Sequence, residues 1–416
     1  MRLLFQPSRL ALTLLTTAAL AACSATPTAR SPEELEARAT RLAQQMLLID
    51  THIDVPIRLH GQGDRADDVS QRAAGGHFDW ERGRAGGLDL AFFSIYVPAE
   101  LQAAGPGAAR AFADGLIDEV EALVRRAADK FELVRSTADA LRIQAAGRMG
   151  IALGIENGAA IEDRLENLAH FQARGVRYIT LTHAQDNLIC DSSYATTRRW
   201  GGLSPFGRDV VAEMNRLGIL VDVSHVTDET FDDVLALARV PPIASHSSCR
   251  HFTPGFERNL DDARIVALAR KGGVIQINFG STFLTAEANR ADQDEQEALE
   301  ALCAAQGVER DSDQARELAR RWRAEHPRVQ THVGDVADHV EHVVALVGHD
   351  QVGIGSDFDG VSALPVGLED VSHYPALVAE LLRRGWSEPE LEKLLGGNLM
   401  RVWVAAERFA AEAAGP

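Results

Sequence analysis

Eight short apolar runs, most of them ending in polar residues and followed by a helix-like stretch, constrain the fold of this chain most strongly. They lie at Leu47–Pro56, Leu88–Val97, Gly150–Asn157, Val176–His183, Gly218–His225, Pro242–Ser247, Gly273–Phe279 and Val352–Asp357. Near-continuous apolar strands that alternate with helices are typical of α/β proteins with a parallel, helix-covered sheet. Eight such units favour a closed (β/α)8 barrel, a TIM barrel, over an open sheet.

Helical patterns fill the intervals between these runs. Ser31–Met46 begins with an N-cap serine, a proline in the first turn and a glutamate three residues after the serine, and it carries an apolar stripe. A strongly charged segment, about 282–330, follows the seventh run and predicts a helical insertion, as a lid or an oligomer contact. We expect the remaining helices at Ala108–Phe131, Asp163–Arg174, Pro205–Leu217, Thr227–Ala238, Asp261–Lys271, Val333–Leu346 and Pro389–Phe409.

The first residues are typical of an export signal. Arg2 and Arg9 precede a short apolar stretch that ends in Leu20-Ala21-Ala22-Cys23, which resembles a bacterial lipobox. This predicts a signal peptide at 1–22, a lipidated Cys23 with a tether at 23–32, and the barrel at 33–416. Ser24 after the cysteine favours the outer membrane, facing the periplasm of a bacterial envelope; the alternative is a plain secretory signal with a chance cysteine.

The charge of the chain argues against a nucleic-acid partner, and its cysteine usage argues against a cysteine-based site. The formal net charge of −18 repels phosphate backbones, so we expect no nucleic-acid partner. Cys190, Cys249 and Cys303 remain once Cys23 is assigned to lipid, and their spacing indicates neither a disulfide framework nor a cysteine zinc site. Oxidation of one pair among them remains open.

Polar residues gather at the ends of the apolar runs. Active sites of (β/α)8 barrels lie at the C-terminal ends of the strands, so these residues are candidates to meet at one mouth. Imidazole and carboxylate donors without thiolates suit zinc, with manganese or cobalt as substitutes. The candidates are His52, Asp54, Glu156, His183, His225, His246, Asp357 and Asp359.

The donor set is too large for one tetrahedral ion. An economical arrangement places His52 and Asp54 on one metal, His225 and His246 on the other, and Glu156 across both. Two dications lower the pKa of a bridging water, which indicates hydrolytic chemistry. His183 and Asp357 would then be free to stabilise an oxyanion and to move a proton.

Longer motifs resemble those of the membrane, or renal, dipeptidase family of binuclear zinc enzymes. The resemblance runs from about Leu48 to Val402. Its most specific part is Gly355-Ser356-Asp357-Phe358-Asp359-Gly360, continued by Gly367–Pro375. It also includes Leu203–Gly207, Val221–His225, Ser245–Ser248 and Gly397-Asn398 with Arg401-Val402.

The resemblance implies a (β/α)8 barrel with two zinc ions per chain, one held by His52, Asp54 and Glu156. It implies that Glu156, His225 and His246 hold the other. A metal-bridging hydroxide would hydrolyse unblocked L-Xaa-L/D-Xaa dipeptides, and a homodimer is a further family expectation. His183 resembles the residue that stabilises the tetrahedral intermediate, Arg258 the arginine that binds the substrate carboxylate, and Asp357 the acid that binds the amino terminus and transfers the proton.

Two positions depart from the family pattern and bear on substrate preference. Glu156 is followed by Asn157-Gly158-Ala159, where some members carry Gly-Gly-His, and Phe279 is followed by Gly280, where the mammalian enzymes carry a tyrosine. One alternative function is a related barrel hydrolase acting on N-acyl amino acids or cyclic amides. Another is a non-catalytic lipoprotein that binds peptides.

Overall fold

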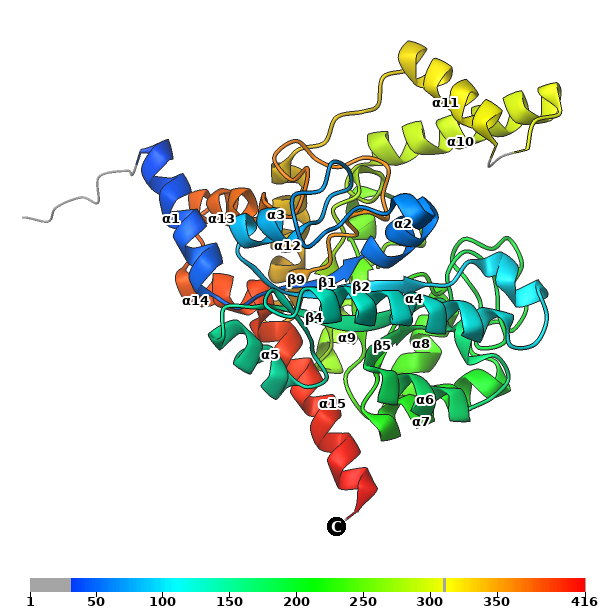
Figure 1. Ribbon diagram of the computed structural model, residues 1–416, viewed down its shortest axis with the longest axis horizontal. Coiled ribbons are helices and arrows are strands. Elements are labelled where there is room, and N and C mark those ends of the chain that lie inside the picture. Colours follow the sequence, from blue (N-terminus) through cyan, green and yellow to red (C-terminus); the bar gives the residue numbers. More distant parts are fainter. Residues whose placement is uncertain (1–30, 310–311, 416) are drawn as a thin grey trace, which may run out of the picture.

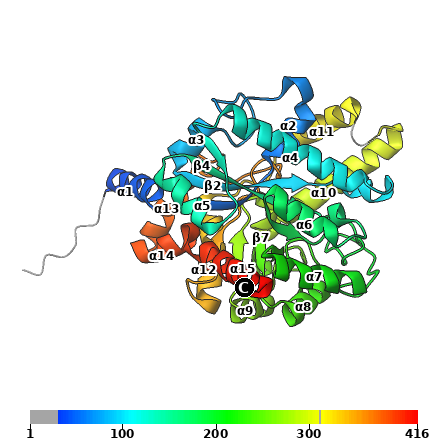
Figure 2. The same cartoon turned by 60° about the horizontal axis from the view of Figure 1, so that its bottom comes forward.

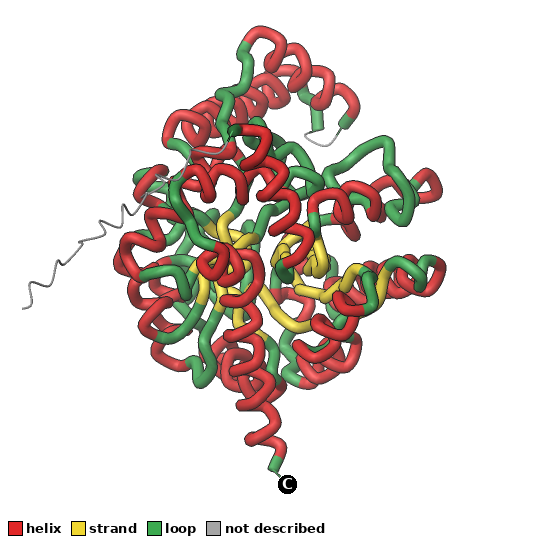
Figure 3. Tube along the Cα trace, turned by 90° about the vertical axis from the view of Figure 1, so that its left-hand side faces the viewer, coloured by secondary structure: helices red, strands yellow, loops and turns green. Residues whose placement is uncertain are grey.

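The computed structural model describes residues 31–309 and 312–415, so the proposed signal peptide and Cys23 lie outside the described residues. Its strands form one parallel sheet in the order β1-β2-β4-β5-β6-β7-β8-β9, surrounded by helices (Figure 3). The strands are β1 (Leu48–Ile53), β2 (Leu88–Tyr96), β3 (Phe131–Leu133), β4 (Met149–Glu156), β5 (Val176–Thr180), β6 (Leu220–Asp222), β7 (Ile243–Ser247), β8 (Val274–Ile277) and β9 (Val352–Ile354).

The sheet closes just beyond the ends of β1 and β9. The backbone N–H of Asp357 donates to the carbonyl of His52 at 3.0 Å, and the N–H of Asp54 donates to that of Phe358 at 2.8 Å. The predicted TIM barrel is therefore confirmed, and its closing contacts lie beside two of the predicted site residues. All eight predicted strands are present, several of them shorter than the apolar runs.

The predicted helices are also present, with ends set by local caps. The side chain of Ser204 accepts the N–H of Gly207 at the start of α7, and the left-handed Gly218 ends it. The helices are α1 (Pro32–Gln45), α2 (Val55–Gln62), α3 (Trp80–Gly86), α4 (Ala108–Arg126), α5 (Thr137–Ala145), α6 (Glu166–Arg174), α7 (Pro205–Leu217), α8 (Asp228–Leu237), α9 (Asp262–Arg270), α10 (Ala286–Gln306), α11 (Asp313–Glu325), α12 (Val333–Val347), α13 (Tyr374–Arg383), α14 (Glu388–Glu392) and α15 (Asn398–Ala414).

Two local predictions were wrong. The helix expected over Ala108–Phe131 ends at Arg126, and Phe131 begins the short strand β3, which pairs with β4 outside the barrel order. No helix is expected from the sequence between Gly61 and Gly87, but the structure forms α3 there, with the buried Asp79 as its N-cap. Both differences involve segments of three to seven residues, which are too short to display a clear hydrophobic period.

The end of the barrel opposite the predicted site is filled by α15 (Figure 2). Trp403 of this helix is fully buried, and its ring packs against Phe92 of β2, which in turn packs against Tyr178 of β5. The interior is thus a packed core that leaves only the C-terminal ends of the strands open to ligands.

The charged segment after β8 forms two helices, α10 and α11, which lie side by side and project from the barrel (Figure 1). Within the described residues, no helix has both the length and the apolar character needed to cross a membrane.

Candidate active site

The structure brings the predicted metal ligands together at the C-terminal ends of four strands. His52 lies near the end of β1, and Asp54 is the N-cap residue of α2, the helix that follows. The strand therefore ends one residue before Asp54, although the sequence pattern placed both residues on it. Glu156 ends β4, His246 lies in β7, and His225 follows β6 with a positive φ of 69°. Left-handed backbone at a non-glycine residue is costly and clusters at functional sites.

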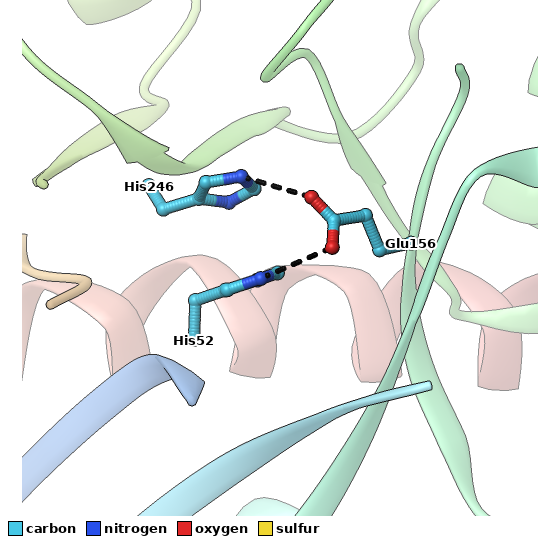
Figure 4. A group of neighbouring side chains, drawn as sticks. All are labelled: His52, Glu156 and His246. Carbon is cyan, nitrogen blue, oxygen red and sulfur yellow. Dashed lines mark ion pairs between the residues drawn. The ribbon is translucent and has the colours of Figure 1, made fainter. Parts of the chain in front are cut away.

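Glu156 divides its two carboxylate oxygens between two groups of ligands. Oε2 lies 3.4 Å from Nε2 of His52, whereas Oε1 lies 3.2 Å from Nε2 of His246 (Figure 4). Oε1 is also 3.0 Å from Nε2 of His225. On the first side, Oδ2 of Asp54 is 3.3 Å from the same nitrogen of His52. This is the geometry of a bridging carboxylate between two sets of donors.

Two of the histidines are held by hydrogen bonds to their outer ring nitrogens. Nδ1 of His52 lies 2.7 Å from the hydroxyl of Tyr178, and Nδ1 of His246 lies 2.7 Å from Oγ of Ser245. Ser245 donates in turn to the buried carboxylate of Asp222 at 2.6 Å. Such contacts fix the ring orientation and direct each Nε2 towards Glu156, as in many metal sites.

The donors fit divalent metal ions. Nε2 of His52 is buried and has no hydrogen-bond partner among the described residues, although it points at two carboxylates. Nε2 of His225 and Nε2 of His246 converge to 2.8 Å. Burial lowers the pKa of both rings well below the ordinary imidazole value, and the nearby Arg258 lowers it further. These imidazoles are therefore neutral at pH 7, the form that binds metal.

The pKa values of Glu156 and Asp357 are shifted in opposite directions. Burial raises the pKa of Asp357 well above its ordinary value, and the negative charges of Asp54 and Glu156 oppose its ionisation further. Burial acts on Glu156 in the same direction, but the imidazoles of His52 and His183 outweigh it and hold that pKa well below its usual range. Glu156 is thus ionised at neutral pH, whereas Asp357 is suited to hold a proton.

A pocket of about 440 Å³ opens over these residues and is lined by Asp54, Glu156, His183, His225 and Asp357, among others. The ring of His183 packs 4.8 Å from that of Tyr96, and its Nε2 lies 3.8 Å from Oε1 of Glu156. His183 therefore reaches both the pocket and the carboxylate of Glu156, so the geometry suits either a metal ligand or a substrate contact.

Arg258 lies against the second group of ligands. It is almost fully buried, donates to Oγ of Ser247 at 2.8 Å and to the carbonyl of His246 at 2.9 Å, and approaches Nε2 of His225 at 3.0 Å. Its Nε has no hydrogen-bond partner in the described part of the chain. A buried, partly unsatisfied guanidinium is an anion-binding group.

Other strand-end and loop residues have structural contacts. Asp359 accepts from Nε of Arg58 at 2.8 Å and from the backbone N–H of His77 at 2.6 Å, which ties the loop after β9 to α2. Neither His77 nor His251 lines the pocket over the metal ligands. Cys190, Cys249 and Cys303 are buried, and none forms a disulfide within the described residues.

Sequence reasoning missed several residues that complete the site. Asn278 donates to Oδ2 of Asp357 at 2.7 Å, and Tyr178 holds His52 from inside β5. Tyr194, from the long loop after β5, lies over His225 with ring centroids 5.7 Å apart. Asn278 ends an apolar run and could have been found by position, whereas Tyr178 lies inside a strand and Tyr194 in an irregular loop.

The two departures from the family pattern have local explanations. The side chain of Asn157 bonds the carbonyl of Val97 and the N–H of Ala159, so it shapes the turn after Glu156. A Cβ at Gly280 would lie 2.6 Å from Val361, so the closely packed turn at this position excludes a larger side chain.

Known proteins resemble this chain over most of its length. Residues 36–416 match the family described as membrane dipeptidase, peptidase family M19. The dipeptidase verJ of Clonostachys rogersoniana is 34% identical over 384 residues, which cover 89% of this chain and 87% of that protein.

Solved structures of similar proteins also align over most of this chain. The probable dipeptidase PvdM of Pseudomonas aeruginosa aligns with a TM-score of 0.79 and 26% identity, over 91% of this chain and all of its own. A metallopeptidase of Rhodobacter sphaeroides, liganded with a phosphinate mimic of L-Ala-D-Ala, aligns with a TM-score of 0.70 and 26% identity, over 87% and 99% of the two chains.

Proposed function

We propose that this chain, which belongs to the membrane dipeptidase family, peptidase family M19, and is a metallo-dipeptidase, binds two zinc ions. We propose further that it uses them to hydrolyse unblocked dipeptides. The observation that carries the proposal is the position of Glu156, with one oxygen towards His52 and the other towards His225 and His246. In this assignment His52, Asp54 and Glu156 hold one ion, and Glu156, His225 and His246 hold the other.

The two ions would supply an acidified water able to attack a peptide carbonyl near neutral pH. The chain itself would orient the substrate by its two charged ends. Arg258 would bind the carboxylate through its unsatisfied Nε and through the N–H that now approaches Nε2 of His225. With the lone pair of that imidazole nitrogen committed to a metal ion, the guanidinium N–H of Arg258 would be free to donate to the substrate.

Asp357 would bind the substrate ammonium group and pass a proton to the leaving amine. Its position is fixed by Asn278 and by a positive φ of 64°. His183 would donate to the oxygen of the attacked carbonyl, where donors placed in advance lower the barrier most effectively. Because both ends of the substrate are bound by charge, longer or N-acylated peptides should be excluded.

The Rhodobacter neighbour supports L,D-dipeptides as part of the substrate panel, because its ligand mimics L-Ala-D-Ala. We further propose that the protein is anchored by a lipid on Cys23, in the outer membrane of a bacterial envelope with the barrel in the periplasm, and that it is a homodimer. The lipid anchor rests on the export-signal pattern that ends in Leu20–Cys23, the outer-membrane location on Ser24, and the homodimer on the family resemblance.

The decisive test measures amino-acid release from L,L- and L,D-dipeptides and from their N-acetylated forms, before chelation, after chelation and after zinc is restored. Zinc-dependent cleavage of the free dipeptides only is expected, with two zinc ions per chain by elemental analysis. Cleavage of only the acylated compounds would favour the N-acyl amino acid hydrolase. Bound zinc without any cleavage would favour a peptide-binding role.

A further inference from the structure

Part of the wall of the catalytic pocket comes from the segment inserted after β8, outside the barrel. Asp292 and Gln296 of α10, in the segment inserted after β8, line the same pocket as Glu156, His183 and Asp357. Asp292 is half-buried, and its Oδ2 accepts from Nε2 of Gln296 at 2.9 Å. An acid from the insertion therefore faces the space where a substrate would lie.

Contacts within the inserted segment hold the start of α10 on both sides of Asp292. One turn earlier, Asn289 donates to the carbonyl of Thr282 at 3.1 Å. One turn later, Glu295 is buried and pairs with Arg323 at 2.5 Å and with Arg328 at 3.7 Å. Residues three positions apart share one helix face, so Asp292 lies on the same face as these two anchored residues, and it lines the pocket at the mouth of the barrel.

Among the described acids that line this pocket, Asp292 is the one that has neither a cationic partner nor a role in the proposed mechanism. Asp54 and Glu156 belong to the metal ligands, and Asp357 accepts from Asn278. Asp359 is neutralised by Arg58 at 2.8 Å. Arg323 and Arg328, whose charges reach Asp292, both pair with Glu295, and no described residue forms an ion pair with Asp292.

We propose that Asp292 is a specificity residue that binds a cationic side chain, an amine or a guanidinium, on the amino-terminal residue of the dipeptide. This inference rests on the proposed function and extends it to a substrate class. The amino-terminal side is assigned because Asp292 lines the same pocket as Asp357, the proposed site of the amino terminus, whereas Arg258 does not line that pocket. Arg258, the proposed carboxylate site, lies against β7.

The test compares kcat/KM of the zinc-loaded enzyme for Lys-Ala with that for norleucyl-Ala, which has a side chain of similar length without the charge. The wild type should prefer Lys-Ala about tenfold, the effect expected of one charged hydrogen bond at a half-exposed site. In Asp292→Asn the ratio should fall to about one, and Asp292→Lys should prefer Glu-Ala over Lys-Ala. High salt should reduce the wild-type ratio, because exposed charges are screened.

Asp294→Asn is the matched control. Asp294 is exposed on the same helix and does not line the catalytic pocket, so this variant should keep the wild-type ratio. An equal ratio in the wild type and in Asp292→Asn would overturn the inference, as would an Asp292-dependent preference for Ala-Lys over Lys-Ala. Failure to cleave any free dipeptide, including Ala-Ala, would instead count against the proposed function.

Discussion

The hydroxyl of Tyr178 lies 2.7 Å from Nδ1 of His52, and the opposite nitrogen of that ring faces both Asp54 and Glu156. The phenol ring occupies the space that a side chain at residue 154 would fill, since a Cβ on Gly154 would lie 2.0 Å from its Cζ. Gly154 in β4 thus leaves room for Tyr178 in β5, which orients the proposed metal ligand His52 in β1.

Removing this hydroxyl should weaken metal binding without disturbing the core. Phe in place of Tyr178 keeps the ring against Gly154 but leaves His52 free to rotate. We expect Tyr178→Phe to lower metal affinity about 10- to 100-fold, as for other residues that support a ligand. Competition with a chromophoric chelator measures this directly, and unchanged affinity would show that packing alone orients His52.

The proposed bridging role of Glu156 predicts that both proposed metal ions are lost together. Glu156→Gln keeps the shape of the side chain but removes its charge, so both metal sites should weaken and turnover should become undetectable. Elemental analysis and dipeptide release measure the two effects. Glu166→Gln, on the exposed first turn of α6, is the control that should behave as wild type; loss of a single metal ion would argue against a bridge.

Arg258 should affect binding more than metal content. Without its guanidinium the substrate carboxylate loses one or two charged hydrogen bonds, so KM for Arg258→Ala should rise about 10- to 100-fold. Arg258→Lys should recover part of the loss, because it restores the charge without the planar fork. Steady-state kinetics with zinc content measured in parallel would refute the assignment if metal were lost while KM stayed constant.

Gly360 should tolerate no side chain, because it lies directly behind two carboxylates. A Cβ at this position would lie 2.2 Å from Oδ1 of Asp357 and 2.3 Å from Oδ2 of Asp54. Gly360→Ala should therefore displace both groups and reduce zinc content and activity. Gly115→Ala on α4 has open space around it and should be neutral or stabilising, by up to about 1 kcal/mol. Wild-type zinc content in Gly360→Ala would contradict this geometry.

The proposed lipid anchor can be tested in cells. Cys23→Ser removes the thiol that would carry the lipid, so the protein should move from the membrane fraction to the soluble periplasmic fraction. Fractionation followed by immunoblotting measures the change. Persistent membrane association of the variant would contradict the lipobox.

Local patterns in the sequence predicted the barrel and the donor side chains that meet at its mouth, because both are encoded in short segments. A parallel strand is a continuous apolar run, and a polar residue at its C-terminal end breaks that run at a recognisable place, as His52 and Glu156 do. The same reasoning failed for β3 and α3, which are short and take their structure from what they pack against.

The sequence by itself thus determined the fold class and the identity of the strand-end donors, since periodicity and residue type are local properties. Only the tertiary structure decided how these donors are shared. It placed one oxygen of Glu156 on each side, set Tyr178 behind His52, and brought Asp292 from an inserted helix into the pocket. The physical reason is that these relationships depend on packing between segments distant in the chain, and no hydrophobic period within one segment records which distant side chain it will meet.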